Sequence, residues 1–363
     1  MAGLFSLTKM SSLDIDDPFF DNLKADYPGT PFSTGFTEWF HRVASQGRSA
    51  LVFNDEQGIG AFVCIKEESE PIPLQEKNLP VCTRVKISTL CIAERYRGQR
   101  LGEGAIGLTL WKWQALGADE IYVTVFSKQQ QLIGQLEKFG FILAGHNLDE
   151  ECVYLRSRYH VDYSDPYRAF PFVNPDFRKA GYLIVNDNFH DTLFPYSELK
   201  NSRGPRVILD VSNGISKTYI GSPISKPHYN PGEPVFIYRK STQPCPKRYN
   251  SCLTTYCIVK EVVHVKSAGQ ALMSYEDYLS RIGNKSIYQP LELQTKYYNE
   301  KTLVIIELVY YGYFGEGNNI TMDWLDRNGC WGTGYPTETQ LSPEQFRKIL
   351  REGNVDVDNV IID

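Results

Sequence analysis

Glycines and arginines gather in residues 93–111, where a strand-like segment gives way to a helix-like one. The stretch reads AERYRGQRLGEGAIGLTLW, and its glycines are Gly98, Gly102, Gly104 and Gly107. An apolar run, VKISTLCI, precedes it, and a helix is expected from about Leu101. The first N–H groups of a helix have no partner within the helix and carry the positive end of its dipole. Glycines let an anion approach those groups without a Cβ in the way, so this spacing indicates a site for a diphosphate.

Arg97 and Arg100 add charged donors to the same turn. No Gly-Lys-Ser/Thr follows the glycines, so the turn is not a P-loop, and it does not match the GxGxxG spacing of dinucleotide-binding folds. The motif therefore indicates an anion cradle of another kind.

Gln99, Gly102 and Gly104 fit the Q/R-x-x-G-x-G/A signature of the GNAT family of N-acetyltransferases, and YRGQRLGEGA closely resembles the usual form of that motif. The downstream LIGQLEKFGF is similar to the end of the family's fourth helix and its following strand. The resemblance covers roughly residues 1–155 and implies acetyl-CoA as cofactor. It implies a diphosphate on the amides of residues 98–104 and a pantetheine arm along the preceding strand. The cofactor-binding residues that it implies are Leu90, Cys91, Ile92, Arg97, Gly98, Gln99, Arg100, Leu101, Gly102, Glu103 and Gly104.

One position departs from the family pattern. Many members have a tyrosine in the fourth helix that protonates the departing thiolate, and this chain has Leu136 there. Ser127 and Lys128 are possible substitutes and Glu94 a possible base, but an ordinary solvated residue is the preferred interpretation of each. The catalytic residues therefore stay unassigned. An α-amino acceptor, with a pKa of roughly 8, would need little help to lose its proton.

The first 156 residues alternate strand-like and helix-like segments, which predicts an α/β fold, and the family resemblance implies the GNAT fold. Strands are expected at LFSLTK, SALVFN, GIGAFVCIK, TRVKISTLCI, EIYVTVF and CVYLRS. Helices are expected at FTEWFHRVASQ, LGEGAIGLTLWKWQALG and KQQQLIGQLEKFG, the last two ended by Gly117 and Gly140.

Residues 157–178 carry Pro166, Pro171 and Pro175 and show no clear period, so we expect a linker there. Residues 179–363 are β-rich and should form a small mixed barrel with peripheral helices. Its expected strands are GYLIVN, RVILDV, PVFIYR, SCLTTYCIVKEVVHV and TLVIIELVYY, and its expected helices are SYEDYLSRI and SPEQFRKILRE.

This second domain combines basic and aromatic residues. Residues 200–270 contain 11 Lys and Arg against 3 acidic residues, although the whole chain has a net charge of −5. Basic groups bind phosphates and aromatic rings stack on unpaired bases, so RNA is a candidate partner. A solvated surface over a tyrosine-packed β core is the alternative. The RNA-binding candidates are Lys217, Tyr219, Arg239, Lys240, Lys247 and Arg248.

Several segments of the second domain resemble a PUA-like domain of the ASCH/EVE kind. The segments are FHDTLFP, NGISKTYIGSPI, NPGEPVFIYRKS, TTYCIVKEVVHV and LSPEQFRKIL. Glu233 stands where those domains usually have Asp after Pro-Gly. The resemblance covers roughly residues 178–355 and implies contact with RNA or modified bases. A looser resemblance is to chains of this arrangement in bacterial toxin–antitoxin loci, which implies an antitoxin protein as a further candidate partner.

Other classes of protein have little support. Eight cysteines without a CxxC pair argue against a disulfide framework and a zinc site, and fit a reducing cytoplasm. The six histidines show no ligand spacing, so no metal is expected, and His190, which Asp191 follows, is interpreted as structural. The N-terminal apolar stretch is too short for a signal peptide. The run TLVIIELVYYGYF is broken by Glu307 and too short to span a bilayer, so no membrane partner is expected.

The leading hypothesis is an acetyl-CoA-dependent N-acetyltransferase that modifies an amine on an RNA or attached to it, such as the α-amino group of an aminoacyl-tRNA. A second hypothesis makes the acceptor a protein or a small amine, with a C-terminal domain that forms a homodimer or higher oligomer. A third, motivated by Leu136, is a non-catalytic RNA-binding protein that senses CoA.

Overall fold

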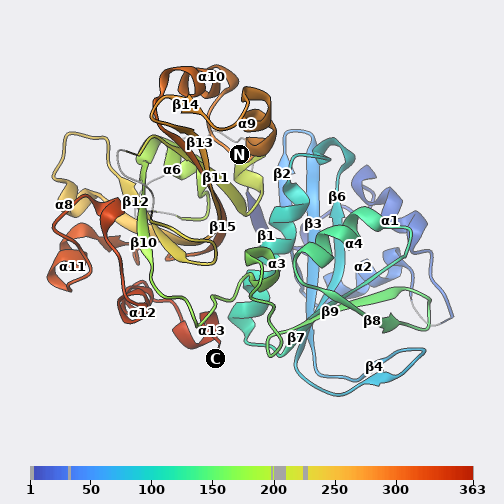
Figure 1. Cartoon of the computed structure of the whole chain (residues 1–363). Coiled ribbons are helices and arrows are strands. Elements are labelled where there is room, and N and C mark those ends of the chain that lie inside the picture. Colours follow the sequence, from blue (N-terminus) through green and yellow to red (C-terminus); the bar gives the residue numbers. More distant parts are fainter. Residues whose placement is uncertain (1–3, 32–33, 198, 200–209, 224–227, 363) are drawn as a thin grey trace. The chain divides into compact units, whose positions relative to one another are not determined.

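The computed structural model describes residues 4–31, 34–197, 199, 210–223 and 228–362, and the chain forms two compact units (Figure 1). The units are Met1–Asp162 and Tyr163–Asp363. The structure differs here from the predicted linker at residues 157–178. Residues 163–178 belong to the second unit, where Phe170 and Phe172 are buried, because aromatic side chains anchor this proline-rich segment in a core.

The first unit is built on one mixed sheet with the strand order β1-β2-β3-β6-β7-β9-β8. Its strands are β1 (Phe5–Lys9), β2 (Ser49–Asp55), β3 (Gly58–Glu68), β6 (Arg84–Ile92), β7 (Glu120–Val125), β8 (Ile142–His146) and β9 (Cys152–Ser157). Neighbouring strands are antiparallel except for β6 and β7, which are parallel. A short hairpin, β4 (Ile72–Pro73) with β5 (Asn78–Leu79), stands apart. The α/β alternation predicted for this unit is confirmed, and β8 follows α4 as the family resemblance implied, whereas β4 and β5 were not predicted.

Helices cover both faces of this sheet. They are α1 (Asp21–Asp26), α2 (Phe36–Ser45), α3 (Leu101–Leu116) and α4 (Gln130–Lys138), with short 3-10 turns η1 (Met10–Ser12), η2 (Pro18–Phe20) and η3 (Glu94–Tyr96). Phe36 and Phe40 of α2 pack with Phe62 of β3, whereas Leu101 of α3 packs with the adjacent Ala61. Because successive side chains of a strand point to opposite faces, α2 and α3 lie on opposite sides of β3.

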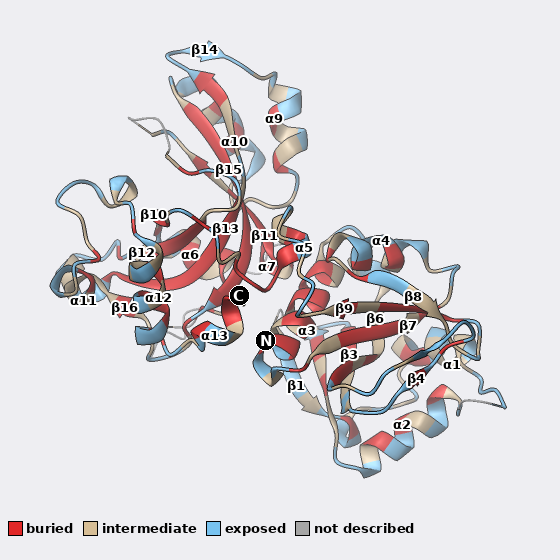
Figure 2. Cartoon of the chain, turned by 60° about the horizontal axis from the view of Figure 1, so that its bottom comes forward, coloured by how far each residue is buried: buried red, intermediate tan, exposed pale blue. Residues whose placement is uncertain are grey.

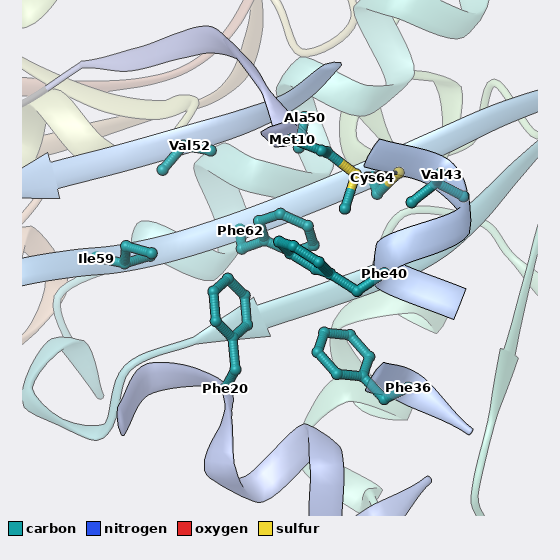
Figure 3. Close-up of a cluster of buried hydrophobic side chains, with 10 residues drawn as sticks. All are labelled: Met10, Phe20, Phe36, Phe40, Val43, Ala50, Val52, Ile59, Phe62 and Cys64. Carbon is teal, nitrogen blue, oxygen red and sulfur yellow. Dashed lines mark hydrogen bonds between the residues drawn. The ribbon is translucent and has the colours of Figure 1, made fainter. Parts of the chain in front are cut away.

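The core beneath α2 is a cluster of buried aromatic and aliphatic side chains (Figure 3). Phe20 is fully buried in it. Its ring centroid lies 5.8 Å from that of Phe36, 5.5 Å from that of Phe40 and 5.3 Å from that of Phe62. The contacts with Phe40 and Phe62 are edge-to-face, the arrangement that the quadrupole of an aromatic ring favours. This cluster fixes α2 against β2 and β3.

The second unit is also a mixed sheet, with the order β10-β12-β13-β15-β11. Its strands are β10 (Gly181–Asn186), β11 (Ser216–Gly221), β12 (Pro234–Lys240), β13 (Cys252–Ser267), β14 (Gln270–Ala271), β15 (Leu303–Tyr313) and β16 (Ile320–Thr321). Register shifts interrupt the pairing of β13 with both neighbours, and such bulges bend a strand. Among the described residues no ladder joins β10 to β11, so the strands form a mixed sheet, but the small barrel that was predicted is not closed between these two strands.

Short helices surround this sheet, with buried residues concentrated along β13 and β15 (Figure 2). They are α5 (Pro166–Ala169), α6 (Asp187–Leu193), α7 (Asp210–Asn213), α8 (Lys247–Asn250), α9 (Tyr275–Ile282), α10 (Pro290–Asn299), α11 (Met322–Arg327), α12 (Pro343–Glu352) and α13 (Val357–Val360), with the 3-10 turn η4 (Pro336–Glu338). The predicted helices α9 and α12 are confirmed. At α12, Ser342 Oγ accepts from the backbone N–H of Gln345, and Gln345 Oε1 accepts from the backbone N–H of Ser342. This pair of bonds is a capping box.

One strand prediction in this unit is wrong in part. RVILDV was expected to be a strand, but Asp210 and Val211 lie in helix α7, and residues 206–209 lie outside the described part of the chain. Val211 is buried, so its apolar side chain packs in the core from a helix and not from a strand.

We expect Phe20→Ala to lower the free energy of unfolding of the first unit by about 3–5 kcal/mol, because it removes a ring from a closed aromatic cluster and leaves a cavity. Leu7→Ala, at a side chain 74% exposed on β1, is the control and should change it by less than about 0.5 kcal/mol. Urea denaturation followed by circular dichroism measures both values. Equal effects of the two substitutions would contradict the role given to the cluster.

Candidate functional site

Strands β6 and β7 pair over only part of their length. The parallel ladder joins Arg84–Ile87 to Glu120–Val123 and ends there, while β6 continues to Ile92 with β3 as its partner on the other side. The edge of β6 from residue 88 to 92 that faces β7 therefore has no ladder among the described residues. Leu90, Cys91 and Ile92, which the family resemblance places beside a pantetheine arm, lie on this edge. Backbone N–H and C=O groups need partners, so an extended ligand with amide groups can pair with it.

The glycine-rich turn leads from the end of β6 into α3. The first backbone hydrogen bond of α3 runs from Gly104 N–H to Arg100 O. The N–H groups of Leu101 and Gly102 come before this bond in the chain and take no part in the hydrogen bonding of the helix. Gly98 has φ +76°, a left-handed conformation that favours glycine. A Cβ at Gly98 would meet no atom within 4 Å, and one at Gly102 would meet only Ile92 Cγ1 at 3.8 Å. Because little stands in front of the backbone here, an anion can reach the N-terminus of α3.

The arginines of the turn form ion pairs within the protein. Arg100 Nη2 lies 3.1 Å from Glu103 Oε1, and both side chains are more than nine-tenths buried. The guanidinium of Arg100 is therefore bound to Glu103 within the protein, and its donation to a diphosphate stays a prediction. Gln99 Nε2 likewise donates to Arg95 O at 2.7 Å. Arg97 is 70% exposed beside Glu94, so it remains the exposed guanidinium of this turn.

Two further residues fix the turn to the sheet. Arg95 Nη2 donates to Asp55 Oδ1 at 3.0 Å, and the hydroxyl of Tyr96 donates to the same carboxylate. The Tyr96 ring packs edge-on against Phe53, and a Cβ at Gly60 would come within 2.6 Å of it. The approach to α3 is therefore tied to β2 through Asp55 and packs against Gly60 of β3.

A cavity of about 710 Å³ opens where β6 and β7 separate. Ser88, Thr89 and Leu90 of β6 and Val123 and Thr124 of β7 line it. Further residues of β6, residues of α1, α2, β3 and α4, and residues of the connecting segments complete the wall: Leu23, Tyr27, Thr34, Phe36, Trp39, Arg42, Val43, Gln46, Arg48, Lys66, Glu68, Lys86, Ile87, Gln129, Leu132 and Glu151. The cavity thus shares its β6 wall with the unpaired strand edge.

Glu151 is a buried carboxylate on the wall of this cavity, 8% exposed. Asn147 holds it in place: Asn147 Nδ2 donates to Glu151 Oε2 at 2.8 Å, and Asn147 Oδ1 accepts from Glu151 N at 2.9 Å. Glu151 Oε1 has no hydrogen-bond partner among the described residues. A buried carboxylate oxygen without a partner is costly, which makes it a candidate to bind an amine or a water molecule.

Tyr27 also lines the cavity. Burial raises the pKa of its hydroxyl well above the usual value, and the nearby Glu151 carboxylate raises this pKa further. Its ring lies 5.2 Å from that of Phe126. Tyr27 therefore keeps its proton near neutral pH and can donate it. Neither Tyr27 nor Glu151 was predicted, because no local motif marks them and only the fold brings them together.

The substitutes considered for the missing tyrosine lie elsewhere. Leu136 is fully buried in the core, so a side chain there does not reach the cavity. Lys128 Nζ binds Asp26 Oδ1 at 2.7 Å, and Glu94 pairs with Arg97. None of these residues, nor Ser127, is among the described residues that line the cavity.

Most RNA-binding candidates of the second unit have partners within the protein. Lys217 is 1% exposed and its Nζ donates to Val211 O. Arg239 binds both oxygens of Asp191, at 2.9 and 3.0 Å. Lys247 Nζ donates to two backbone carbonyls, and Arg248 pairs with Asp323 and Asp326. These four side chains are not an open basic surface, which corrects the prediction for them.

Lys240 and Tyr219 differ from the other four. Both line a cavity of about 330 Å³ between the unjoined strands β10 and β11. Phe189, Tyr288 and Tyr335 add aromatic rings to its wall. Lys240 is exposed and has no ion pair in the described part of the chain.

His190 is fully buried in a polar network instead of a cavity wall. Its Nδ1 lies 2.8 Å from Asp191 Oδ1, and its Nε2 lies 2.6 Å from Thr254 Oγ1. An acid, an imidazole and a hydroxyl in line resemble a catalytic triad, but Thr254 is also fully buried and has no access for a substrate. The geometry favours the structural interpretation made from the sequence.

The described residues show neither a metal-binding cluster nor a membrane-spanning helix. They contain no group of three or more His, Cys, Asp or Glu residues able to hold a metal ion. No helix among them is both long and apolar enough to cross a membrane.

Comparison with protein-family models and with curated protein sequences gives no match. Solved structures give partial likenesses. A mutant of ZmASCH from Zymomonas mobilis is 13% identical, covers 48% of this chain and 96% of its own, and has a TM-score of 0.31. NAA60 from Arabidopsis thaliana in complex with acetyl-CoA is 16% identical and covers 42% and 98%, with a TM-score of 0.30. The GNAT family N-acetyltransferase YhbS from Escherichia coli in complex with CoA is 19% identical and covers 43% and 82%, with a TM-score of 0.29. Likenesses of this size do not assign the chain to a family.

We expect the stability of the second unit to fall with pH partly through His190. Burial lowers the pKa of His190 below its ordinary 6.5, although Asp191 opposes the shift. The unfolded chain therefore takes up a proton below about pH 6.5 that the folded chain refuses, so this contribution is complete above that pH and is lost as the pH falls. His190→Asn should be less stable at neutral pH and should show a shallower loss of unfolding free energy between about pH 7 and about pH 5.

Urea denaturation at a series of pH values measures the two slopes. His264→Asn, at a half-buried histidine of β13 in the same unit, is the matched control and should keep the wild-type slope. The same slope in wild type and His190→Asn would refute this assignment.

Proposed function

We propose that the chain is an acetyl-CoA-dependent N-acetyltransferase whose acceptor is an amine on an RNA or attached to one, and that the second unit, a PUA-like domain, binds that RNA. The observation that carries the proposal is the continuity of one strand. The unpaired edge of β6 lines the cavity, and the glycine-rich turn joins the end of this strand to the N-terminus of α3. A ligand with a diphosphate at one end and a chain of amides behind it fits this sequence of surfaces.

The residues of the first unit can be given roles on this basis. The N–H groups of Leu101 and Gly102 would hold the diphosphate, and the free edge of residues 88–92 would hold the pantetheine amides. Bound acetyl-CoA supplies an acetyl group activated as a thioester. Transfer forms a C–N bond to the acceptor amine and breaks the C–S bond, while the amine loses a proton and the sulfur gains one.

Tyr27 and Glu151 have the chemistry that this proton balance needs. The Glu151 carboxylate can accept the proton of the amine through Oε1, which has no partner among the described residues. The Tyr27 hydroxyl lines the same cavity and carries a proton at neutral pH, so it can donate a hydrogen bond to the departing sulfur, although its raised pKa makes it a weaker acid than an exposed tyrosine. Burial also raises the pKa of the nearby Cys91 thiol to about 11, so Cys91 stays a neutral thiol on this edge and is a poor nucleophile.

The cavity between β10 and β11 supports the RNA part of the proposal. Its aromatic rings can stack with an unpaired base, and Lys240 can contact a phosphate beside it. Thr218 Oγ1, also on the wall, is buried with no hydrogen-bond partner among the described residues and can bond to a base edge.

Gly102→Glu should abolish measurable binding of acetyl-CoA, because a carboxylate would stand in front of the N–H groups at the start of α3. The variant should fold, since a Cβ at this position meets only one atom, at 3.8 Å. Gly134→Glu is the matched control: Gly134 is an exposed helical glycine of α4 with nothing within 4 Å of its Cβ. Isothermal titration calorimetry compares the two. Wild-type affinity in folded Gly102→Glu would remove the proposed cofactor site.

Lys240→Ala should weaken binding of single-stranded RNA and reduce its salt dependence by a slope of about 0.7 for the lost phosphate contact. Lys301→Ala, an exposed lysine outside this cavity, should leave both unchanged. Fluorescence anisotropy with a labelled RNA oligonucleotide at several salt concentrations measures the slopes. Equal slopes in wild type and Lys240→Ala would favour a protein or small-amine acceptor and a different role for the second unit.

A further inference from the structure

The cavity of the first unit carries a row of cations at the end where β6 and β7 are still paired. Lys66 of β3 and Lys86 of β6 are direct cross-strand partners, and Lys86 stands opposite Tyr122 of β7. Arg48 directly precedes β2, the next strand of the sheet, and Arg42 reaches the same cavity from α2. Like charges on neighbouring strands repel, so this row is unfavourable without an anion.

The protein neutralises only part of this charge. Glu68 lies 2.9 Å from Lys66 and also accepts from the hydroxyl of Tyr122. Arg42, Arg48 and Lys86 have no ion pair within the described part of the chain, and Lys86 Nζ sits 5.5 Å over the ring of Tyr122. Arg48 and Lys86 are both partly buried, where a cation interacts more strongly with an anion than it does in open solvent.

A negatively charged group, the carboxylate of Glu151, lies at the other end of the cavity. Glu151 immediately precedes β9, whose first residue, Cys152, pairs with Val125 at the end of β7. Lys86 is in register with Tyr122, so the backbone positions of Lys86 and Cys152 lie three residues, or about 10 Å, apart along β7, and Glu151 lies one residue beyond Cys152. Glu151 thus stands where the strands have separated, and the cations stand where they are joined.

We propose that the acceptor is an amine that also carries an anionic group, a phosphate or a carboxylate, held by Arg48 and Lys86 while Glu151 receives the amine. The inference rests on the proposed acetyl transfer and names the substrate class of the same cavity. One molecule with both charges satisfies the unpartnered Oε1 of Glu151 and offsets the cation row at once. An alkylamine without an anionic group can pair with Glu151 Oε1 but cannot offset the charge of the cation row.

The test compares primary alkylamines with ω-aminoalkyl phosphates and ω-amino acids of the same chain lengths as acetyl acceptors. We expect the anionic series to have a KM lower by about tenfold or more at the best chain length, as for a charge-assisted hydrogen bond. Arg48→Gln and Lys86→Gln should raise the KM of the anionic acceptors toward that of the alkylamines, and should change the KM of the alkylamines by a smaller factor. Glu151→Gln should lower kcat for every acceptor. Lys112→Gln, which removes an exposed charge from α3 outside the cavity, is the control and should have no effect.

Calorimetric titration of the same aminoalkyl phosphates and amino acids measures binding without transfer. It should show binding to wild type and weaker binding to Arg48→Gln and Lys86→Gln, and the stronger of the two series identifies the anion as phosphate or carboxylate. Transfer to all amines with equal KM, or equal titrations for wild type and both variants, would overturn the substrate class and leave the transferase standing. Binding of anionic amines without any acetyl transfer would instead refute the proposed function and keep the charge assignment of the cavity.

Discussion

The early end of the ladder between β6 and β7 is the constraint on which the rest of the first unit depends. Parallel neighbours normally continue to share hydrogen bonds, and a strand edge left without them must find other partners. Here β6 goes on for five residues beyond the last pair, at Ile87 and Val123. The separation of β6 from β7 creates both the free backbone edge of β6 and the cavity beside it. The glycine-rich turn then joins the end of β6 to the start of α3.

The turn that follows β6 is stabilised by backbone hydrogen bonds within it, such as that from Arg97 N–H to Glu94 O, and by side chains that hold it in place. Arg100 takes a left-handed conformation, which is unfavourable for a residue with a Cβ, and its buried ion pair with Glu103 holds it there. Asp55 binds Arg95 and Tyr96 and fixes the other side of the turn to β2 and β3. These bonds hold the turn that leads into the N-terminus of α3, and a preformed site binds an anion with less reorganisation.

Sequence patterns predict the helices and strands whose signals are local, and they fail for features that depend on contacts between residues far apart in the chain. Periodicity and capping residues are local, so α3 with Gly117 at its end and α12 with Ser342 as its cap could be predicted. The short strands β4 and β5 have no such signal. Counts of basic residues fail in the second unit, because the acids that bind Arg239 and Arg248 lie 48 or more positions away in the chain. Glu151 gives no local signal either, since its importance comes from burial and from the separation of two other strands.

Transfer of label from acetyl-CoA in a cell extract tests the central claim most directly. The protein is incubated with radiolabelled acetyl-CoA and the extract, and RNA, protein and small molecules are then separated and counted, with the same extract lacking the protein as the blank. The account predicts label above the blank in the RNA fraction, released by ribonuclease treatment or by hydrolysis of an aminoacyl ester. Label confined to proteins or small molecules would contradict the RNA-linked acceptor, and no label above the blank in any fraction would contradict the acetyltransferase itself.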